Sequence, residues 1–300
     1  MRYSGVILIM FLSFLFFNCQ KEKNKLFSLV PSSNSGITFS NTITQSDSFN
    51  IIDYTYLYNG SGVGVADFNN DGLQDVFFAG NMVSNKLYIN QGDLKFKDIS
   101  ESSGISSPNR WCTGVSVVDI NSDGYQDIYV CAADIYYGNN GINLLYINNG
   151  DLTFTEMAEP YGIADTAYST QGAFFDYDKD GDLDLYVLTN WQNSYSQNNA
   201  RPKITDGSSP SNDRLYRNEG MGSLGHPVFR NVTLEAGITI EGHGLGIAVS
   251  DINLDGWPDV YVANDFLTND LLWINNQDGT FSNKAGDYTR HQTHNGMGTD

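Results

Sequence analysis

Four short segments of the 300-residue chain repeat one arrangement of aspartate, asparagine and glycine. Each has Asp at position 1, Asn or Asp at position 3, Asp at position 5, Gly at position 6 and Asp at position 9. The segments are Asp67–Asp75, Asp119–Asp127, Asp176–Asp184 and Asp251–Asp259. Oxygen ligands at alternate positions of a tight turn point toward one centre, and Ca²⁺ takes about six to eight of them. The spacing therefore predicts one calcium site in each loop.

The side chains at positions 1, 3, 5 and 9 are the predicted ligands, and the glycine permits a turn that presents the position 7 carbonyl. In chain order the ligands are Asp67, Asn69, Asp71, Leu73, Asp75, Asp119, Asn121, Asp123, Tyr125, Asp127, Asp176, Asp178, Asp180, Asp182, Asp184, Asp251, Asn253, Asp255, Trp257 and Asp259. An all-oxygen set without His or Cys favours Ca²⁺ over zinc and copper, and Mg²⁺ demands stricter octahedral geometry. We expect about four Ca²⁺ sites.

Asp, Asn and Gly also form turns without any metal, which is the alternative interpretation. Turn propensity does not account for the Asp that recurs at position 9 in all four loops, where the next strand has begun. Without a cation, the crowded carboxylates of each loop would repel one another and oppose closure of the hairpin. Calcium explains the whole pattern, and turn formation explains a part of it.

Each loop is flanked by runs typical of β-strands, apolar before it and β-branched or aromatic after it. Second strands are predicted at 76–78, 128–130, 185–187 and 260–262, third strands at 87–90, 145–148, 215–218 and 272–275, and fourth strands at 95–99, 153–157, 228–232 and 280–281. The loops begin at residues 67, 119, 176 and 251, which are 52, 57 and 75 residues apart. Four strands at such a period are expected of β-propeller blades.

The predicted fold is thus all-β, a β-propeller of four-stranded antiparallel blades with the calcium-binding loops between first and second strands. The propeller would occupy residues 37–300, with repeats at about 60–111, 112–168, 169–242 and 243–294. Residues 296–300 resemble the strand that leads into a fifth loop, so we expect a partial propeller. Either further blades belong to a longer parent protein, which we favour, or the segment 36–58 completes a small ring.

The N-terminus predicts export. The apolar run 5–17 is too short to span a bilayer and is typical of a signal peptide, here residues 1–18. Phe16-Phe17-Asn18-Cys19 resembles a bacterial lipoprotein signal, in which Cys19 is lipidated and residues 19–36 form a tether. This predicts a membrane-anchored lipoprotein at the cell envelope or surface. Because Phe16 and Asn18 depart from the preferred residues of that signal, simple cleavage and secretion is the alternative.

The composition of the chain and the residues outside the acidic loops argue against several other functional classes. The net charge is −19 and only 16 residues are Lys or Arg, so a nucleic-acid surface is excluded. Cys112 and Cys131 fall in adjacent strands, and buried free thiols are favoured over a disulfide. No hydrolase, phosphate-loop or haem motif is present. His243, His291 and His294 lack a third ligand or a general base and are interpreted as ordinary histidines.

A polar insertion at 190–213 separates the second and third strands of the third repeat. Long loops on rigid scaffolds often bind ligands. It contains Trp191, Tyr195, Arg201 and Lys203, which suit sugars or acidic groups, and a disordered surface loop is the alternative.

The four loops and their flanking strands resemble the FG-GAP or VCBS repeat family over about residues 60–300, whose calcium loops lie between the first two strands of each blade in integrin α-subunit propellers. The sequence segments 145–154 and 235–238 resemble a bacterial branch of secreted repeat proteins, some of which carry an ASPIC/UnbV domain. No segment of this sequence resembles that domain. The resemblance implies an adhesion or ligand-binding module in which calcium stabilises the loops and does not catalyse.

The expected function is therefore binding of a protein or glycan partner, without catalysis, without nucleic acid, and with membrane contact only through the lipid anchor. One alternative is a lyase-like, polysaccharide-active enzyme on a calcium-rich propeller, which would need Lys, Arg, Tyr or His clustered at the propeller mouth. Another is a structural scaffold of a surface complex.

Overall fold

The computed structural model describes residues 26–135, 141–191, 201–265, 268–292 and 295–299. The predicted signal peptide, Cys19, Tyr195 and His294 lie outside the described residues. Within them the regular secondary structure is almost entirely β-strand, with three single-turn helices, α2 (Ser32–Ser35), α3 (Ala158–Tyr161) and α4 (Ala285–Tyr288). None of these described helices has the length or the apolar character needed to cross a membrane.

Four sheets of four antiparallel strands follow one another along the chain, and the strands of each sheet are hydrogen-bonded in sequence order. The first sheet consists of β1 (Val63–Ala66), β2 (Asp75–Phe78), β3 (Lys86–Asn90) and β4 (Phe96–Asp98). The second consists of β5 (Trp111–Val118), β6 (Asp127–Ala133), β7 (Leu144–Asn148) and β8 (Phe154–Glu156). The third consists of β9 (Ser169–Phe175), β10 (Asp184–Thr189), β11 (Arg214–Met221) and β12 (Pro227–Asn231). The fourth consists of β13 (Gly244–Ser250), β14 (Asp259–Asn264), β15 (Leu271–Asn275) and β16 (Phe281–Asn283).

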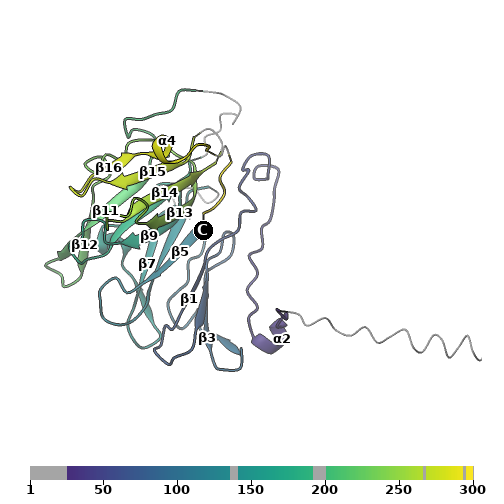
Figure 1. The fold of residues 1–300 in the computed structure, drawn as a ribbon. Coiled ribbons are helices and arrows are strands. Elements are labelled where there is room, and N and C mark those ends of the chain that lie inside the picture. Colours follow the sequence, from purple (N-terminus) through teal and green to yellow (C-terminus); the bar gives the residue numbers. More distant parts are fainter. Residues whose placement is uncertain (1–25, 136–140, 192–200, 266–267, 293–294, 300) are drawn as a thin grey trace, which may run out of the picture.

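The sheets are arranged as propeller blades. Each first strand contacts the first strand of the next sheet, β1 with β5, β5 with β9 and β9 with β13, so these strands gather along one axis. In Figure 1 the sheets succeed one another from the blue first sheet to the yellow fourth. This confirms the predicted all-β, propeller-like fold with four-stranded blades.

Apolar side chains fill the spaces between neighbouring sheets. Phe77 and Ile128 share the cluster between the first and second sheets, while Leu185 belongs to the cluster between the second and third. A sheet with a neighbour on both faces buries both faces of its strands. Every residue of β6 and β10 is accordingly buried, whereas β2 alternates between buried and half-buried residues.

Glycines permit the close approach of first strands at the axis. A Cβ atom on Gly114 of β5 would lie 2.5 Å from the carbonyl oxygen of Thr170 in β9. The same holds at Gly246 of β13, where a Cβ would lie 2.7 Å from the Cα of Gly298. Residues 295–299 therefore lie against β13 much as β9 lies against β5. The fifth repeat itself stays a prediction.

The N-terminal segment runs beside the first sheet (Figure 1), where Phe39 stacks on Phe78 of β2. Among residues 36–58 the only β-pairing in the structure is an isolated bridge between Ser46 and Phe49, so this segment adds no strand to the four sheets. It nevertheless reaches the fourth sheet, because the Tyr56 hydroxyl donates to the Asp265 carboxylate at 2.7 Å. The two remaining cysteines, Cys112 and Cys131, are buried free thiols.

Candidate metal centres in the loops between first and second strands

All four acidic loops join the first strand of a sheet to the second, as the sequence predicts. The glycine at position 6 has a positive φ in every loop, for example 89° at Gly124 and 99° at Gly181. Position 4 is also left-handed although it is not glycine, with φ of 58° at Ser122 and 60° at Lys179. At position 6 the φ lies between 86° and 99°, where a side chain would strain the backbone, so the backbone requires glycine there. The left-handed residue at position 4 is not visible in the sequence.

The aspartate at position 9 has no exposed surface in any of the four loops. In the second loop, one oxygen of Asp127 accepts the N–H of Ile120 at 3.1 Å and the other accepts the N–H of Asn148 at 2.8 Å. The equivalent pairs of donors are Phe68 and Asn90 for Asp75, Tyr177 and Asn218 for Asp184, and Ile252 and Asn275 for Asp259. Each position 9 carboxylate therefore links its own loop to the third strand of the sheet. Carboxylate oxygens retain further lone pairs for a cation.

Burial, assisted by the carboxylates of the same loop, raises the pKa of Asp127 and of Asp184 to about 7. Burial also raises the pKa of Asp75. The backbone N–H groups that each aspartate accepts lower the pKa and only partly offset burial. A nearby cation would favour the ionised form of each of these groups.

The first, second and fourth loops have Asn at position 3 and satisfy their own acidic groups. In the second loop, the two oxygens of Asp119 accept the N–H groups of Asp123 and Gly124 at 3.0 and 2.9 Å. The Asn121 amide donates to Asp123 at 2.9 Å, and Asp123 accepts the N–H of Tyr125 at 2.9 Å. The first and fourth loops repeat these bonds. In these three loops most of the exposed acidic oxygens are held by hydrogen bonds within the loop.

The third loop is different because Asp178 occupies position 3. Oxygens of Asp176, Asp178 and Asp184 all lie within 4.8 Å of one another. Oδ1 of Asp176 and Oδ1 of Asp178 are buried and have no hydrogen-bond partner. Burial, together with the carboxylate of Asp180, raises the pKa of Asp178. Buried charged oxygens without partners are strongly unfavourable unless a counter-charge compensates them. This donor set therefore fits a hard cation such as Ca²⁺.

The residues at position 7 follow the glycine, and their backbone groups take part in the hydrogen bonds of the loop. Tyr125, Leu73, Asp182 and Trp257 each donate their N–H to the position 5 carboxylate. The Trp257 ring instead lies under the ammonium group of Lys179, with Nζ 4.8 Å from the ring centroid. The assignment of all the predicted ligands, Asp67 to Asp259, stays a prediction.

Neighbouring loops and sheets are linked by asparagine side chains whose role the sequence analysis missed. Asn148 of β7 donates to the Phe68 carbonyl of the first loop at 2.8 Å. Asn275 of β15 donates in the same way to the Tyr177 carbonyl of the third loop at 2.8 Å. Asn recurs at the corresponding position of the third strand in all four sheets, at residues 90, 148, 218 and 275, and this recurrence was the available signal.

The other predicted candidates do not form a site among the described residues. Arg201 of the insertion is held by a two-pronged ion pair, at 2.5 and 2.8 Å, with the buried carboxylate of Glu241. His291 is exposed, and burial lowers the pKa of His243. The ion pair assigns Arg201 a structural role in anchoring the insertion.

The family model described as the FG-GAP-like repeat matches residues 67–130 and 131–187, which contain the first three acidic loops. The chain is 28% identical over 209 residues to cartilage acidic protein 1 of Mus musculus, and the alignment covers 68% of this chain and 29% of that protein. It is 27% identical over 210 residues to the Homo sapiens protein, covering 68% and 28%. The chain thus spans less than a third of the length of these curated relatives.

A solved structure also aligns with the chain. Its title describes the specific recognition of non-reducing terminal N-acetylglucosamine by an Agrocybe aegerita lectin. The alignment has 18% sequence identity and a TM-score of 0.30, and it covers 73% of this chain and 64% of that chain.

Proposed function

We propose that this chain, which carries FG-GAP-like repeats, is an exported binding module whose blades are stabilised by Ca²⁺ in the loops between first and second strands. The observation that carries the calcium proposal is the third loop, where two buried carboxylate oxygens lack a partner and three carboxylates converge. Asp176, Asp178 and Asp184 would hold the ion there. The position 1, 3, 5 and 9 side chains of the other loops would hold the remaining ions.

Bound Ca²⁺ would supply positive charge that offsets the repulsion among the carboxylates of each loop. Each loop connects two strands of one sheet, and its position 9 aspartate also binds the third strand. A cation that fixes the loop thus fixes the edge of the whole blade. We assign it a structural role.

Binding is favoured over catalysis by the cavity at the centre of the first strands. Its described lining contains no Asp, Glu, His, Lys, Arg or Cys. General acid–base catalysis needs a titratable group with a pKa near the working pH. Of the tyrosines in this lining, Tyr54 has its pKa raised by burial, which keeps its hydroxyl protonated. The lining contains tyrosines, which the lyase-like alternative requires, but no described Lys, Arg or His accompanies them, so we infer a module for a protein or glycan partner.

Thermal unfolding of the chain from residue 20 onward tests the calcium proposal. We expect the unfolding midpoint to rise with saturating Ca²⁺ and to fall with a chelator. One site at 100 times its Kd contributes about 2.7 kcal/mol to the folded state. Equilibrium dialysis should give about four ions per chain, and Mg²⁺ at the same concentration is the matched control. An unfolding midpoint that does not respond to Ca²⁺ would contradict the calcium proposal and show that the loops are turns without a metal.

The binding proposal is tested separately with the calcium-loaded protein. Immobilised protein is screened against glycans and envelope proteins with Ca²⁺ and with chelator, and polysaccharides are incubated with it while new reducing ends are counted. We expect calcium-dependent capture without turnover. Steady release of reducing ends would instead support the enzyme.

We also propose export with a lipid anchor on Cys19, from the apolar run that precedes this residue. Cells fed a tagged fatty acid should label the wild-type protein but not Cys19→Ala, and the variant should leave the membrane fraction. An unlabelled but exported wild-type protein would establish simple secretion.

A further inference from the structure

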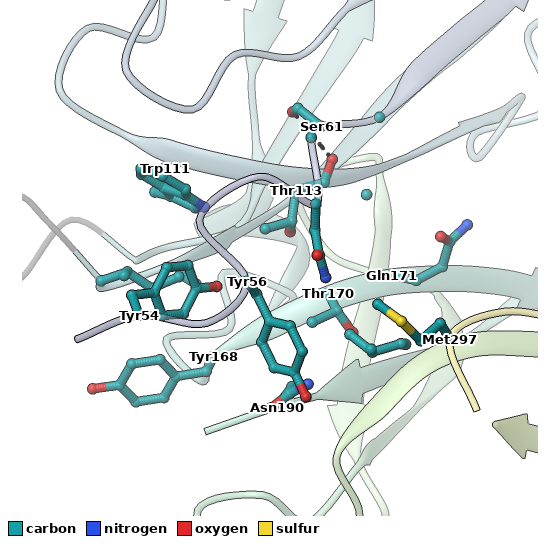
Figure 2. A pocket seen from close by; sticks show the side chains of 17 residues that line it. Tyr54, Tyr56, Ser61, Trp111, Thr113, Tyr168, Thr170, Gln171, Asn190 and Met297 are labelled. Atoms are coloured by element: carbon teal, nitrogen blue, oxygen red, sulfur yellow. Dashed lines mark hydrogen bonds between the residues drawn. The ribbon is translucent and has the colours of Figure 1, made fainter. Parts of the chain in front are cut away.

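A cavity of about 330 Å³ lies where the first strands converge, apart from the acidic loops. Its wall includes the N-terminal segment 54–62, residues of β5 and β9, Leu245 of β13 and Met297 (Figure 2). Its volume is at the lower end of the range of about 300–1,000 Å³ that ligand pockets occupy. It can therefore hold one small ligand or one unit of a longer one.

The chemistry of the wall is aromatic and polar but uncharged. Tyr54, Tyr56, Trp111 and Tyr168 contribute rings, and side-chain amides and hydroxyls lie among them. Because no described lining residue carries a formal charge, neither an anion nor a cation would find a counter-charge there. The cavity suits a neutral ligand that has both apolar faces and hydroxyl groups.

Asn190 gives independent support for a ligand. It follows β10, its side chain is only 6% exposed, and it lines the cavity (Figure 2). Both Oδ1 and Nδ2 of this amide are buried without a hydrogen-bond partner. Its backbone is fixed, since the Asn190 N–H donates to the Tyr168 carbonyl at 2.8 Å. Buried amides are normally hydrogen-bonded, so this one requires an explanation.

Three hydroxyl groups of the wall are already committed to protein partners. The Thr113 hydroxyl donates to the Ser169 carbonyl, and the Thr170 hydroxyl donates to the Gly244 carbonyl, each at 2.8 Å. The Tyr56 hydroxyl donates to Asp265, which leaves the Tyr56 ring as its contribution to the wall. By contrast, the Gln171 side chain makes no hydrogen bond within the described residues. The uncommitted amides of Asn190 and Gln171 are therefore among the groups available to a ligand.

The aromatic part of the wall is held rigidly. The Trp111 ring meets Phe49 edge to face at 5.5 Å and Tyr54 at 5.8 Å between ring centroids. Trp111 is 2% exposed. Aromatic rings fixed in this way lose little conformational entropy when a ligand packs on them.

We propose that this cavity binds one residue of a neutral saccharide, with a hydroxyl group hydrogen-bonded to the Asn190 amide and the ring packed on the aromatic wall. A sugar hydroxyl both donates and accepts hydrogen bonds. Two neighbouring hydroxyls of one sugar can therefore satisfy Asn190 together, one donating to Oδ1 and the other accepting from Nδ2. This inference rests on the proposed function of the chain as a binding module and names the ligand class and the site.

Saturation-transfer NMR and calorimetric titration test it on calcium-loaded protein. The probes are the methyl glycosides of glucose, galactose and mannose, with glucuronate as a charged comparison. We expect at least one neutral glycoside to bind and glucuronate to bind more weakly. Asn190→Leu should weaken binding at least about tenfold, a loss that removal of a ligand-bonded amide produces. Gln171→Ala should weaken it less.

The design separates a lost ligand contact from a lost fold. Because Asn190 has no protein partner, Asn190→Leu should leave the unfolding midpoint unchanged or raise it. Tyr288→Ala removes a tyrosine that is 50% exposed on α4 and does not line the cavity, and it should bind as the wild type does. Wild-type affinity in Asn190→Leu, or no glycoside bound by protein that still shows its calcium response, would overturn the saccharide site. The second result would leave the proposed binding function standing.

Discussion

The second and third acidic loops share one spacing and one backbone, yet their carboxylates are in opposite situations. In the second loop, Asn121 donates to Asp123 and both oxygens of Asp119 accept backbone N–H groups. In the third loop, Asp178 replaces the amide, and buried oxygens of Asp176 and Asp178 lack partners. A carboxylate in place of the amide at position 3 thus accompanies the change from a turn that satisfies itself to a cluster of negative charge.

The difference shows that one motif can combine two physical roles. Where position 3 is an amide, the loop closes through its own hydrogen bonds and a cation would add to an existing structure. Where it is a carboxylate, closure brings like charges together, and a cation would be needed to offset their repulsion. We therefore expect the third loop to depend on calcium more strongly than the second. The following predictions test that ranking.

The largest effect is expected at position 9, where the two loops are alike. Asp127→Ala and Asp184→Ala should each destabilise the protein by about 2–6 kcal/mol, because each leaves two buried N–H groups unpaired at about 1–3 kcal/mol apiece. Denaturant unfolding in chelator measures the loss. Asp278→Ala, at a surface turn, is the matched control and should change little. Unequal losses at Asp127 and Asp184 would show that the loops differ at position 9 as well.

The pH dependence of the metal-free protein comes next. Asp127 and Asp184 have a pKa of about 7 in the folded state, above the ordinary value of 3.8, so the folded protein binds more protons between these limits. Their contribution to stability is fully present below pH 4 and is lost as pH rises through 7. The slope is at most about 1.4 kcal/mol per pH unit for each carboxylate.

Saturating Ca²⁺ should flatten this profile, because the ion holds the carboxylates ionised while calcium binding itself weakens in acid. Unfolding free energies at several pH values, with Ca²⁺ and with chelator, measure both curves. A metal-free protein that gains stability from pH 5 to pH 8 would contradict the prediction.

Exchanging position 3 between the loops tests the comparison directly. Asp178→Asn should lower the calcium affinity of the third loop roughly tenfold and stabilise the metal-free protein, since affinity follows the charge of the ligands. Asn121→Asp should do the reverse in the second loop. Calcium titrations of both variants and of the double variant measure the change. Equal affinities in all of them would remove position 3 as the determinant.

The smallest effect is expected from the asparagines that join neighbouring blades. Asn148→Ala and Asn275→Ala each remove the bond to a loop carbonyl in the preceding blade, together with two bonds inside their own blade. We expect the bond between blades to contribute about 1 kcal/mol of the loss in each variant. Asn149→Ala, which removes only exposed side-chain bonds, is the control. Asn275 bonds the third loop and Asn148 bonds the first. If closure of the third loop depends more on contacts from the next blade, Asn275→Ala should also reduce calcium affinity more than Asn148→Ala does.

Local pattern was enough to predict the strands, their order and the position of the acidic loops, because strand alternation and turn residues are encoded within a few neighbours. The partners of the position 9 aspartates were not predictable in this way. Asp127 binds Asn148 across a sheet, and Asn148 in turn reaches Phe68 in another blade. The cavity was missed for the same reason, since Tyr54, Trp111 and Asn190 meet only after the blades assemble.

The hydrogen bond from Tyr56 to Asp265 joins residues 209 positions apart in the chain, and this separation bears on how the protein folds. The entropy lost on closing a loop grows with its length. We therefore do not expect a contact this distant to form before the intervening sheets have shortened the effective loop. During synthesis the segment around Tyr56 emerges well before the fourth sheet. The wall that Tyr56 contributes to the central cavity should therefore be completed among the last events of folding, after the acidic loops have closed.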